Sequence, residues 1–253
     1  MNILVCNDDG FDAAGIRVLV SVLSAKHNIT VAAPDTERSG ASHSLTFHSF
    51  LRYEKADFPG AAEAYKIYGT PADCVKFGTG NIMRLKPDIV VSGINRGPNI
   101  GSDIMYSGTV AAAFEAAYLG FCGIALSINK FGDDIDLYTR AAKFLLSKID
   151  AFAALEQRRS TAYNINYPDF PENQIKGAAV AKAGRQDYSD VYTADEKDKD
   201  RYWLSGEPLK EKHIHNDGDC DVELIKRGYI TVTPVTFDAT DFGALDSLKG
   251  IKL

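Results

Sequence analysis

The sequence predicts an α/β protein with a doubly wound, mostly parallel sheet in three layers (α/β/α) and a smaller β-rich C-terminal segment. Two observations support this prediction. Short runs of β-branched residues alternate with amphipathic helical patterns through roughly the first 150 residues. The strand-like runs are also continuously apolar, which is typical of parallel strands that helices cover on both faces.

In chain order, the apolar runs predict strands at residues 3–6, 29–33, 89–92 and 124–128. Apolar residues at 3.6-residue spacing predict helices at residues 14–26, 108–119 and 135–149. Residues 69–74 are typical of a turn that leads into another helix. Strands separated by helices require crossover connections, and these are expected to be right-handed.

The pattern weakens after residue 160. Strands are predicted at residues 163–167, 180–185 and 229–235, the last stopping at Pro234, and the charged run 195–201 predicts a solvated loop or hairpin tip. We expect a single domain over residues 1–253. Residues 1–180 are expected to form the α/β core that carries the active site. Residues 181–253 are expected to form an appendage used in oligomerisation.

Composition excludes several classes of protein. The chain of 253 residues has a formal net charge of −6, which disfavours binding to a nucleic-acid polymer. Its four cysteines form no CxxC pair, so we expect reduced thiols and no zinc site. No apolar run approaches the length of a membrane span, and the N-terminus lacks the features of a signal peptide. These observations predict a cytoplasmic protein without a membrane partner.

Polar clusters follow three of the predicted strands. They are residues 7–10, 38–42 and 92–99, and a fourth cluster at residues 106–109 opens a predicted helix. In an open parallel sheet, ligands bind outside the carboxyl ends of the strands. We therefore expect these distant segments to meet at one edge of the sheet.

The first cluster contains two adjacent carboxylates, Asp8 and Asp9, followed by Gly10, which permits a turn with positive φ. With Ser39 and Asn95 they would form a shell of oxygen ligands suited to Mg²⁺, Mn²⁺ or Ca²⁺. Each residue also has a purely structural alternative. The aspartates suit a turn that caps the following helix, Ser39 suits a loop, and Asn95 suits a left-handed turn.

The helix that begins near Ser107, Gly108 and Thr109 presents free backbone N–H groups and a positive dipole end, which favour a phosphate. Asn99 is a candidate donor to a phosphoryl oxygen. The alternatives are an ordinary N-cap at Ser107 and a role of Asn99 in shaping its loop.

Together these strings resemble the SurE (survival protein E) family in order and spacing over most of residues 1–130. The strings are Asn7-Asp8-Asp9-Gly10, Ser39-Gly40-Ala41-Ser42, Gly69-Thr70-Pro71-Ala72-Asp73-Cys74, Ser92-Gly93-Ile94-Asn95-Arg96-Gly97-Pro98-Asn99 and Tyr106-Ser107-Gly108-Thr109-Val110.

The resemblance implies a Rossmann-like fold and a metal-dependent phosphomonoesterase that acts on nucleoside 5′- and 3′-monophosphates, with short polyphosphate as a further substrate in some relatives. It implies one divalent cation per subunit, Mg²⁺ or Mn²⁺, with Ca²⁺ as a substitute in a crystal. The implied ligands are Asp8, Asp9, Ser39 and Asn95, and Asp8 and Asp9 are the candidate catalytic residues. The implied phosphate pocket contains Asn99, Ser107, Gly108 and Thr109. Homodimers or homotetramers that exchange their C-terminal parts are also implied.

The chain departs from the family pattern at two places. Cys220-Asp221 stands where a Thr-Asp pair is usual, and His43 stands where asparagine is common.

Three other functions fit the sequence less well. A phosphatase with an aspartyl intermediate usually carries a DxD pair, whereas the two aspartates after the first predicted strand are adjacent here, and no trailing lysine motif is evident. A receiver-type signalling module needs an aspartate after the strand at 89–92, which instead ends in Ser92. A dinucleotide-binding oxidoreductase needs a GxGxxG motif after the first strand, and none is present.

Overall fold

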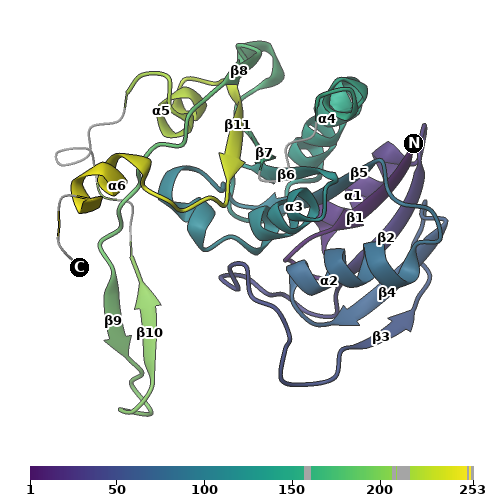
Figure 1. The fold of residues 1–253 in the computed structure, drawn as a ribbon, viewed down its shortest axis with the longest axis horizontal. Helices are drawn as coiled ribbons and strands as arrows, with labels where there is room; N and C mark the ends of the chain where they lie inside the picture. The colour runs from purple at the N-terminus through teal and green to yellow at the C-terminus, as the bar shows by residue number, and fades with distance from the viewer. Residues whose placement is uncertain (157–160, 207–208, 210–216, 250, 252–253) are drawn as a thin grey trace.

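The computed structural model describes residues 1–156, 161–206, 209, 217–249 and 251. Within these residues the main sheet has nine strands in the order β3-β4-β2-β1-β5-β6-β7-β11-β8. A separate hairpin, β9–β10, extends away from the body (Figure 1).

Strand β1 (Asn2–Cys6) lies in the middle of the sheet, parallel to β2 (Asn28–Pro34) on one side and β5 (Ile89–Arg96) on the other. The sheet continues through β4 (Glu63–Tyr68) to the antiparallel edge strand β3 (Arg52–Lys55). On the other side it continues through β6 (Cys122–Ile128) and β7 (Thr161–Tyr167), both parallel to β5. The chain moves outward in one direction from β1 and then returns to its other side, so β1 lies at a topological switch point.

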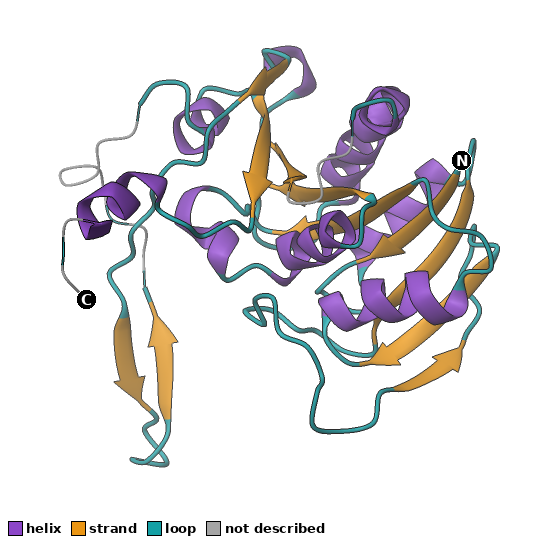
Figure 2. Ribbon diagram, viewed as in Figure 1, coloured by secondary structure: helices purple, strands orange, loops and turns teal. Residues whose placement is uncertain are grey.

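Helices cover both faces of the sheet (Figure 2). Helices α1 (Ala14–Leu23) and α4 (Ile135–Ala153) lie together on one face, and α2 (Pro71–Phe77) and α3 (Gly108–Tyr118) lie together on the other. Side chains of β1 alternate between the two cores: Ile3 and Val5 pack with α1, whereas Leu4 and Cys6 pack with α2. The predicted three-layer, mostly parallel fold is confirmed.

The C-terminal third agrees only in part with the prediction. Strand β11 (Ile230–Thr236) pairs with β7 and runs through Pro234, so the predicted stop at that proline is wrong. The Val232 carbonyl accepts from Ala181 N on the β8 side, and Pro234, two residues later, faces the same side. Because β8 (Ala178–Val180) pairs only as far as Val232, the missing N–H of Pro234 breaks no ladder bond there.

The predicted strand at 180–185 is also wrong, since β8 ends at Val180 and only an isolated bridge follows at Lys182. The charged run does form the tip of a hairpin, between β9 (Val191–Ala194) and β10 (Tyr202–Ser205). Helices α5 (Asp221–Lys226) and α6 (Phe242–Lys249) were not predicted. The proposed division at residue 180 stays a prediction, although β11 lies within the main sheet.

Three short helical segments complete the order. They are η1 (Gly78–Ile82), η2 (Gly101–Met105) and η3 (Glu172–Gln174). Of these, η2 connects the end of β5 to α3 and therefore lies between two of the predicted functional segments.

Helix α1 packs against the irregular end of β5, and this contact requires a glycine. A Cβ at Gly15 would lie 2.1 Å from the backbone oxygen of Ile94. We expect Gly15→Ala to lower the free energy of unfolding by about 3 kcal/mol or more, because the backbone must shift to admit the methyl group. Gly80→Ala is the control, since a Cβ there meets nothing within 4 Å. Equal urea midpoints for the two variants would contradict this close contact.

Candidate functional site

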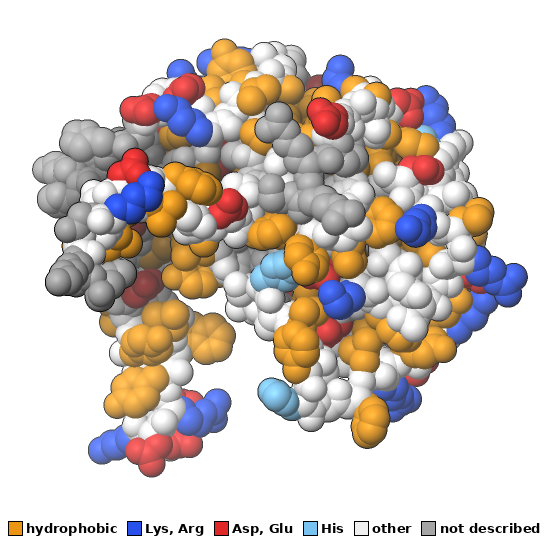
Figure 3. All heavy atoms as spheres, viewed as in Figure 1, with side chains coloured by type: hydrophobic (Ala, Val, Ile, Leu, Met, Phe, Trp, Pro, Cys, Tyr) orange, Lys and Arg blue, Asp and Glu red, His pale blue; other side chains and the backbone are white. Residues whose placement is uncertain are grey.

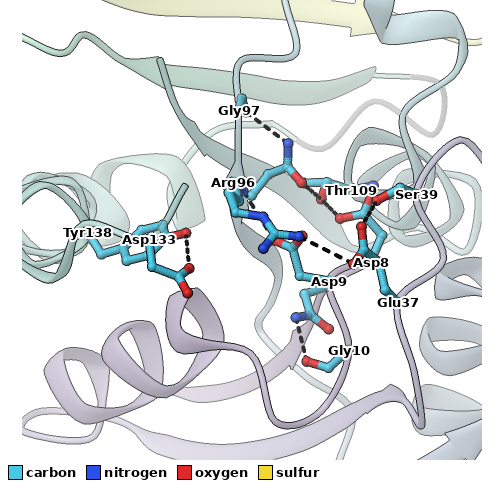
Figure 4. A network of polar contacts seen from close by, with 12 residues as sticks. Asp8, Asp9, Gly10, Glu37, Ser39, Arg96, Gly97, Thr109, Asp133 and Tyr138 are labelled. Carbon is cyan, nitrogen blue, oxygen red and sulfur yellow. Dashed lines mark hydrogen bonds and ion pairs between the residues drawn. The ribbon is translucent and has the colours of Figure 1, made fainter. Parts of the chain in front are cut away.

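The sheet brings the predicted polar segments together at the carboxyl end of β1. Asp8 and Asp9 follow β1, Glu37 and Ser39 follow β2, Arg96 ends β5, and Thr109 lies in the first turn of α3. Figure 4 shows the side chains of these residues grouped around one region. The expectation that distant loops meet at one edge of the sheet agrees with this arrangement.

Asp8 is almost fully buried, with 4% of its surface exposed. Its Oδ2 accepts a hydrogen bond from Thr109 N at 3.1 Å, and its Oδ1 accepts one from the Thr109 hydroxyl. Gly108 is required for this approach, because a Cβ there would lie 2.8 Å from the Asp8 Cβ. The N-terminus of α3 therefore binds the carboxylate of Asp8 in this structure.

Burial raises the pKa of Asp8, and the hydrogen bonds from Thr109 oppose that rise without cancelling it. Burial and the charge of Asp8 raise the pKa of Asp9 to about 6, while Arg96 acts in the opposite direction. Two neighbouring carboxylates that both resist ionisation need a positive charge to stabilise their charged forms.

Asp9 accepts a hydrogen bond from Arg96 N at 3.1 Å, and the Arg96 guanidinium lies 3.8 Å from it. The same guanidinium pairs with Glu37 at 3.2 Å. Arg38 pairs with Asp35 at 3.0 Å. The guanidinium groups of Arg96 and Arg38 are thus each paired with carboxylates.

A turn at Gly10 directs both aspartates towards this region. Gly10 has a φ of +100°, and its carbonyl accepts from Asn7 Nδ2 at 2.8 Å. Asn7 is fully buried, so this bond holds the turn against the end of β1. The positive φ that the sequence suggested at Gly10 is present.

Ser39 and Asn95 have different surroundings. The Ser39 hydroxyl donates to Glu37 Oε1 at 2.7 Å. Asn95 Nδ2 donates to the Gly97 carbonyl at 2.8 Å, while its Oδ1 lies 3.4 Å from the Thr109 hydroxyl. Asn95 therefore turns its oxygen towards the Asp8–Thr109 pair and its amide nitrogen away.

These residues fit a hard divalent cation. The donor set consists of two buried carboxylates with raised pKa values, an amide oxygen and a hydroxyl, which are the ligand types that Mg²⁺ and Mn²⁺ prefer. Within the part of the chain that the structure describes, no group of three or more His, Cys, Asp or Glu residues is arranged to hold a metal. Among the four residues of this donor set, Asp8 and Asp9 are the two that carry negative charge to balance an ion.

The four residues expected to bind phosphate lie on both sides of η2. Ser107 is the N-cap of α3, and its hydroxyl accepts from Val110 N at 3.1 Å. Asn99 Nδ2 donates to the Ser127 hydroxyl at 2.9 Å. Gly108 packs on Asp8, and Thr109 donates to it, so in this structure these two residues support the carboxylate.

Two asparagines of β7 were not predicted as site residues. Asn164 and Asn166 are fully buried, and both donate to the Asn99 carbonyl, at 2.7 and 3.0 Å. Asn166 also accepts from Asn99 N at 2.8 Å. Residues two apart in a strand face the same side, so the spacing of two asparagines in an apolar strand was the available signal.

The chain is similar in sequence to proteins of known family over most of its length. The family model described as "Survival protein SurE" matches residues 3–190. The chain is 41% identical over 256 residues to the 5′-nucleotidase SurE of Fervidobacterium nodosum, covering 99% of this chain and 97% of that one. It is 40% identical to the 5′-nucleotidase SurE of Alkaliphilus metalliredigens, covering 100% and 99% of the two chains.

This chain belongs to the SurE family. A crystal structure of the SurE protein from Aquifex aeolicus has a TM-score of 0.82 to it at 34% identity, with 98% of each chain covered. The resemblance inferred from the motifs of the sequence is thereby confirmed, and it extends over the full length.

Ionisation of Asp9 predicts how the stability of this SurE protein depends on pH without metal. Its pKa is about 6 when folded and near 3.8 otherwise, so the folded protein binds the extra proton between these values. The free energy of unfolding therefore falls as the pH rises from about 4 to 6. We expect Asp9→Asn to be about 2–3 kcal/mol more stable than the parent at pH 8 and equal to it near pH 3.5. Thermal unfolding in a chelator measures this, and equal melting temperatures at pH 8 would contradict it.

Proposed function

We propose that this SurE protein hydrolyses nucleoside 5′- and 3′-monophosphates to nucleoside and phosphate with the help of a divalent cation. The observation that carries the proposal is the pair of carboxylates at the switch point of the sheet, with Asp8 buried and the side chain of Asp9 only 8% exposed. Relatives at 40–41% identity over the whole chain are named 5′-nucleotidases, which supports the same activity. The alternative of a receiver-like signalling module finds no support among these relatives.

The residues proposed to hold one Mg²⁺ or Mn²⁺ per subunit are Asp8, Asp9, Ser39 and Asn95. When bound, such an ion neutralises phosphoryl charge and lowers the pKa of water. Thr109 holds Asp8 in place by two hydrogen bonds. Arg96 orients Asp9 through its backbone N–H and is itself held by Glu37.

Four further residues of the site are proposed to bind and orient the substrate. Asn99, Ser107, Gly108 and Thr109 are the candidate contacts to the phosphate. Asn99 is held by Ser127 of β6, Ser107 by the backbone N–H of Val110 in α3, and Thr109 by Asp8. Phosphoryl transfer depends mainly on positioning and charge neutralisation, and rigid contacts serve both. Asp8 and Asp9 are the candidate catalytic residues.

The experiment is dialysis against a chelator followed by assay of phosphate release from 5′-AMP and 3′-AMP, with Mg²⁺ or Mn²⁺ restored in parallel. Short polyphosphate is assayed alongside. We expect activity on both nucleotides only after the metal is restored. Full activity without metal would refute the role of the cation, and no release from any phosphomonoester despite tight metal binding would favour the signalling alternative.

We also propose a homodimer or homotetramer in which residues 181–253 contribute to the contact. The hairpin β9–β10 supports this proposal, because it extends from the body and carries exposed apolar side chains (Figure 3). Trp203 is 77% exposed and Tyr192 is 69% exposed. Light scattering of the parent and of Trp203→Ser tests it, with a smaller mass expected for the variant.

A cytoplasmic location is proposed on the basis of the four cysteines, which are all free and buried. No helix among the described residues is both long enough and apolar enough to cross a bilayer.

A further inference from the structure

The loop between Asn99 and Ser107 carries the candidate phosphate contacts at both of its ends, yet its middle is held by a different part of the chain. The loop contains η2. Its first residue, Asn99, is fixed by β7, and its last, Ser107, is fixed by α3. Between them, residues 101–103 contact two C-terminal segments, residues 184–188 and the start of α5.

Asp221 is the centre of this contact. It is the first residue of α5 and is fully buried. Its Oδ2 accepts from Gly101 N at 3.0 Å, and its Oδ1 accepts from Gly184 N and from Val222 N, both at 2.8 Å. A single carboxylate thus joins three backbone N–H groups, and the loop residue Gly101 lies 120 residues from Asp221 in the sequence.

Apolar and polar contacts surround this carboxylate. Ile100 packs in one buried cluster with Cys220, Val222 and Ile225. Gln186 N donates to the Ser102 hydroxyl at 2.9 Å, and the Tyr188 hydroxyl donates to Asp103 Oδ2 at 2.6 Å. A Cβ at Gly101 would lie 3.1 Å from the Gly184 carbonyl, so the two backbones are in close contact.

We infer that Asp221 is a positioning residue for phosphate binding: it fixes the loop 99–107 through Gly101, and the Tyr188–Asp103 bond supports the same loop. The inference rests on the proposed function, because it assigns the loop to the phosphate of the substrate. It concerns the phosphate group common to all substrates, so the nucleobase has no part in it.

The substitution Asp221→Asn tests this selectively. In this variant the side-chain oxygen of asparagine can still accept the bonds from Gly184 N and Val222 N. Its NH₂ group then faces Gly101 N, and two donors cannot form a hydrogen bond with each other. The variant therefore loses the bond to the loop and retains the two that hold α5. Asp219→Asn is the matched control, since Asp219 is two residues away and exposed, and its carboxylate pairs with Lys182 at the surface.

We expect Asp221→Asn to raise KM about tenfold for both 5′-AMP and glycerol 2-phosphate, with kcat changed less than about threefold. The inhibition constant of inorganic phosphate should rise in parallel, and the Kd for Mn²⁺ should stay unchanged. Tyr188→Phe should raise KM in the same direction by about threefold, because it removes one hydrogen bond to the loop. Asp219→Asn should match the parent in each measurement.

A purely structural Asp221 would lower the melting temperature and leave KM and phosphate inhibition within about twofold of the parent, and that result would overturn the inference. If Asp221→Asn does not fold, the KM of Tyr188→Phe tests the inference instead: a rise supports it, and an unchanged KM overturns it. Hydrogen exchange of the 99–107 amides is an independent readout. Faster exchange in Asp221→Asn than in Asp219→Asn, together with the raised KM, supports the inference, and equal exchange overturns it. If the parent protein hydrolyses no phosphomonoester, the proposed function is refuted instead. Hydrogen exchange would then still show whether Asp221 fixes the loop 99–107.

Discussion

Replacing Asp8 and Asp9 together by asparagine should abolish nucleotide hydrolysis, with kcat/KM lower by at least about 1,000-fold. Removal of a single group that stabilises a transition state costs about 10²–10³ in rate, and this variant removes both carboxylates proposed to hold the cation. The two buried side chains have raised pKa values, so their neutral replacements fit the site without a folding penalty from charge. The measurement is phosphate release from 5′-AMP at saturating Mn²⁺.

The control for this experiment is Asp12→Asn, which lies in the same segment. The Asp12 side chain is 62% exposed and pairs with Arg17 and Lys66 at the surface. We expect Asp12→Asn to keep the activity of the parent. Activity of the double variant within tenfold of the parent would show that hydrolysis does not depend on these carboxylates.

Thr109→Val should lower kcat/KM by about 10–100-fold, the range found when a residue that orients a metal ligand is lost. Valine has nearly the shape of threonine but has no hydroxyl group, so Asp8 loses the O–H donor to Oδ1 and keeps the backbone bond from residue 109. Without that bond the Asp8 side chain is held less firmly and its pKa rises further. Weaker Mn²⁺ binding, measured by calorimetry, should accompany the loss of activity.

Thr109→Ser is the matched control for Thr109→Val, because it restores the hydroxyl and removes only a methyl group. We expect it to retain most of the activity of the parent. The two variants behaving alike would mean that the hydroxyl of residue 109 does not orient Asp8.

The sheet and its two helical layers were predictable because their strands are continuously apolar. Val90 and Val91 lie in opposite cores, and the apolar run at 89–92 reflects both faces. The apolar run stops at residue 92, so the predicted strand is shorter than the observed one. Strand β5 continues to Arg96 through residues that were not predicted to belong to it. Pairing with β6 holds this polar end, and such pairing is tertiary information.

The C-terminal third was harder to predict for a related reason. The nitrogen of Pro234, which carries no hydrogen, faces the side on which β8 has already ended. Only the pairing of β11 with β8 shows that a proline is tolerated at this position. Helix α5 has six residues, too few for a clear 3.6-residue pattern.

The candidate site was predictable as a set of segments and less so as a set of contacts. Clusters after strands meet at one edge for topological reasons. That Thr109 donates hydrogen bonds to Asp8 depends on how closely α3 approaches the end of β1 across Gly108. Likewise, Asn164 and Asn166 acquire their role only because β7 lies beside the Asn99 loop.

The most direct test is a crystal structure of the protein soaked in Mn²⁺, with the ion located by its anomalous scattering. We expect a single strong peak in each subunit within coordinating distance of carboxylate oxygens from both residue 8 and residue 9, with Ser39 and Asn95 oxygens nearby. A peak that neither of these carboxylates contacts, or an empty site in a crystal that hydrolyses 5′-AMP, would contradict the account.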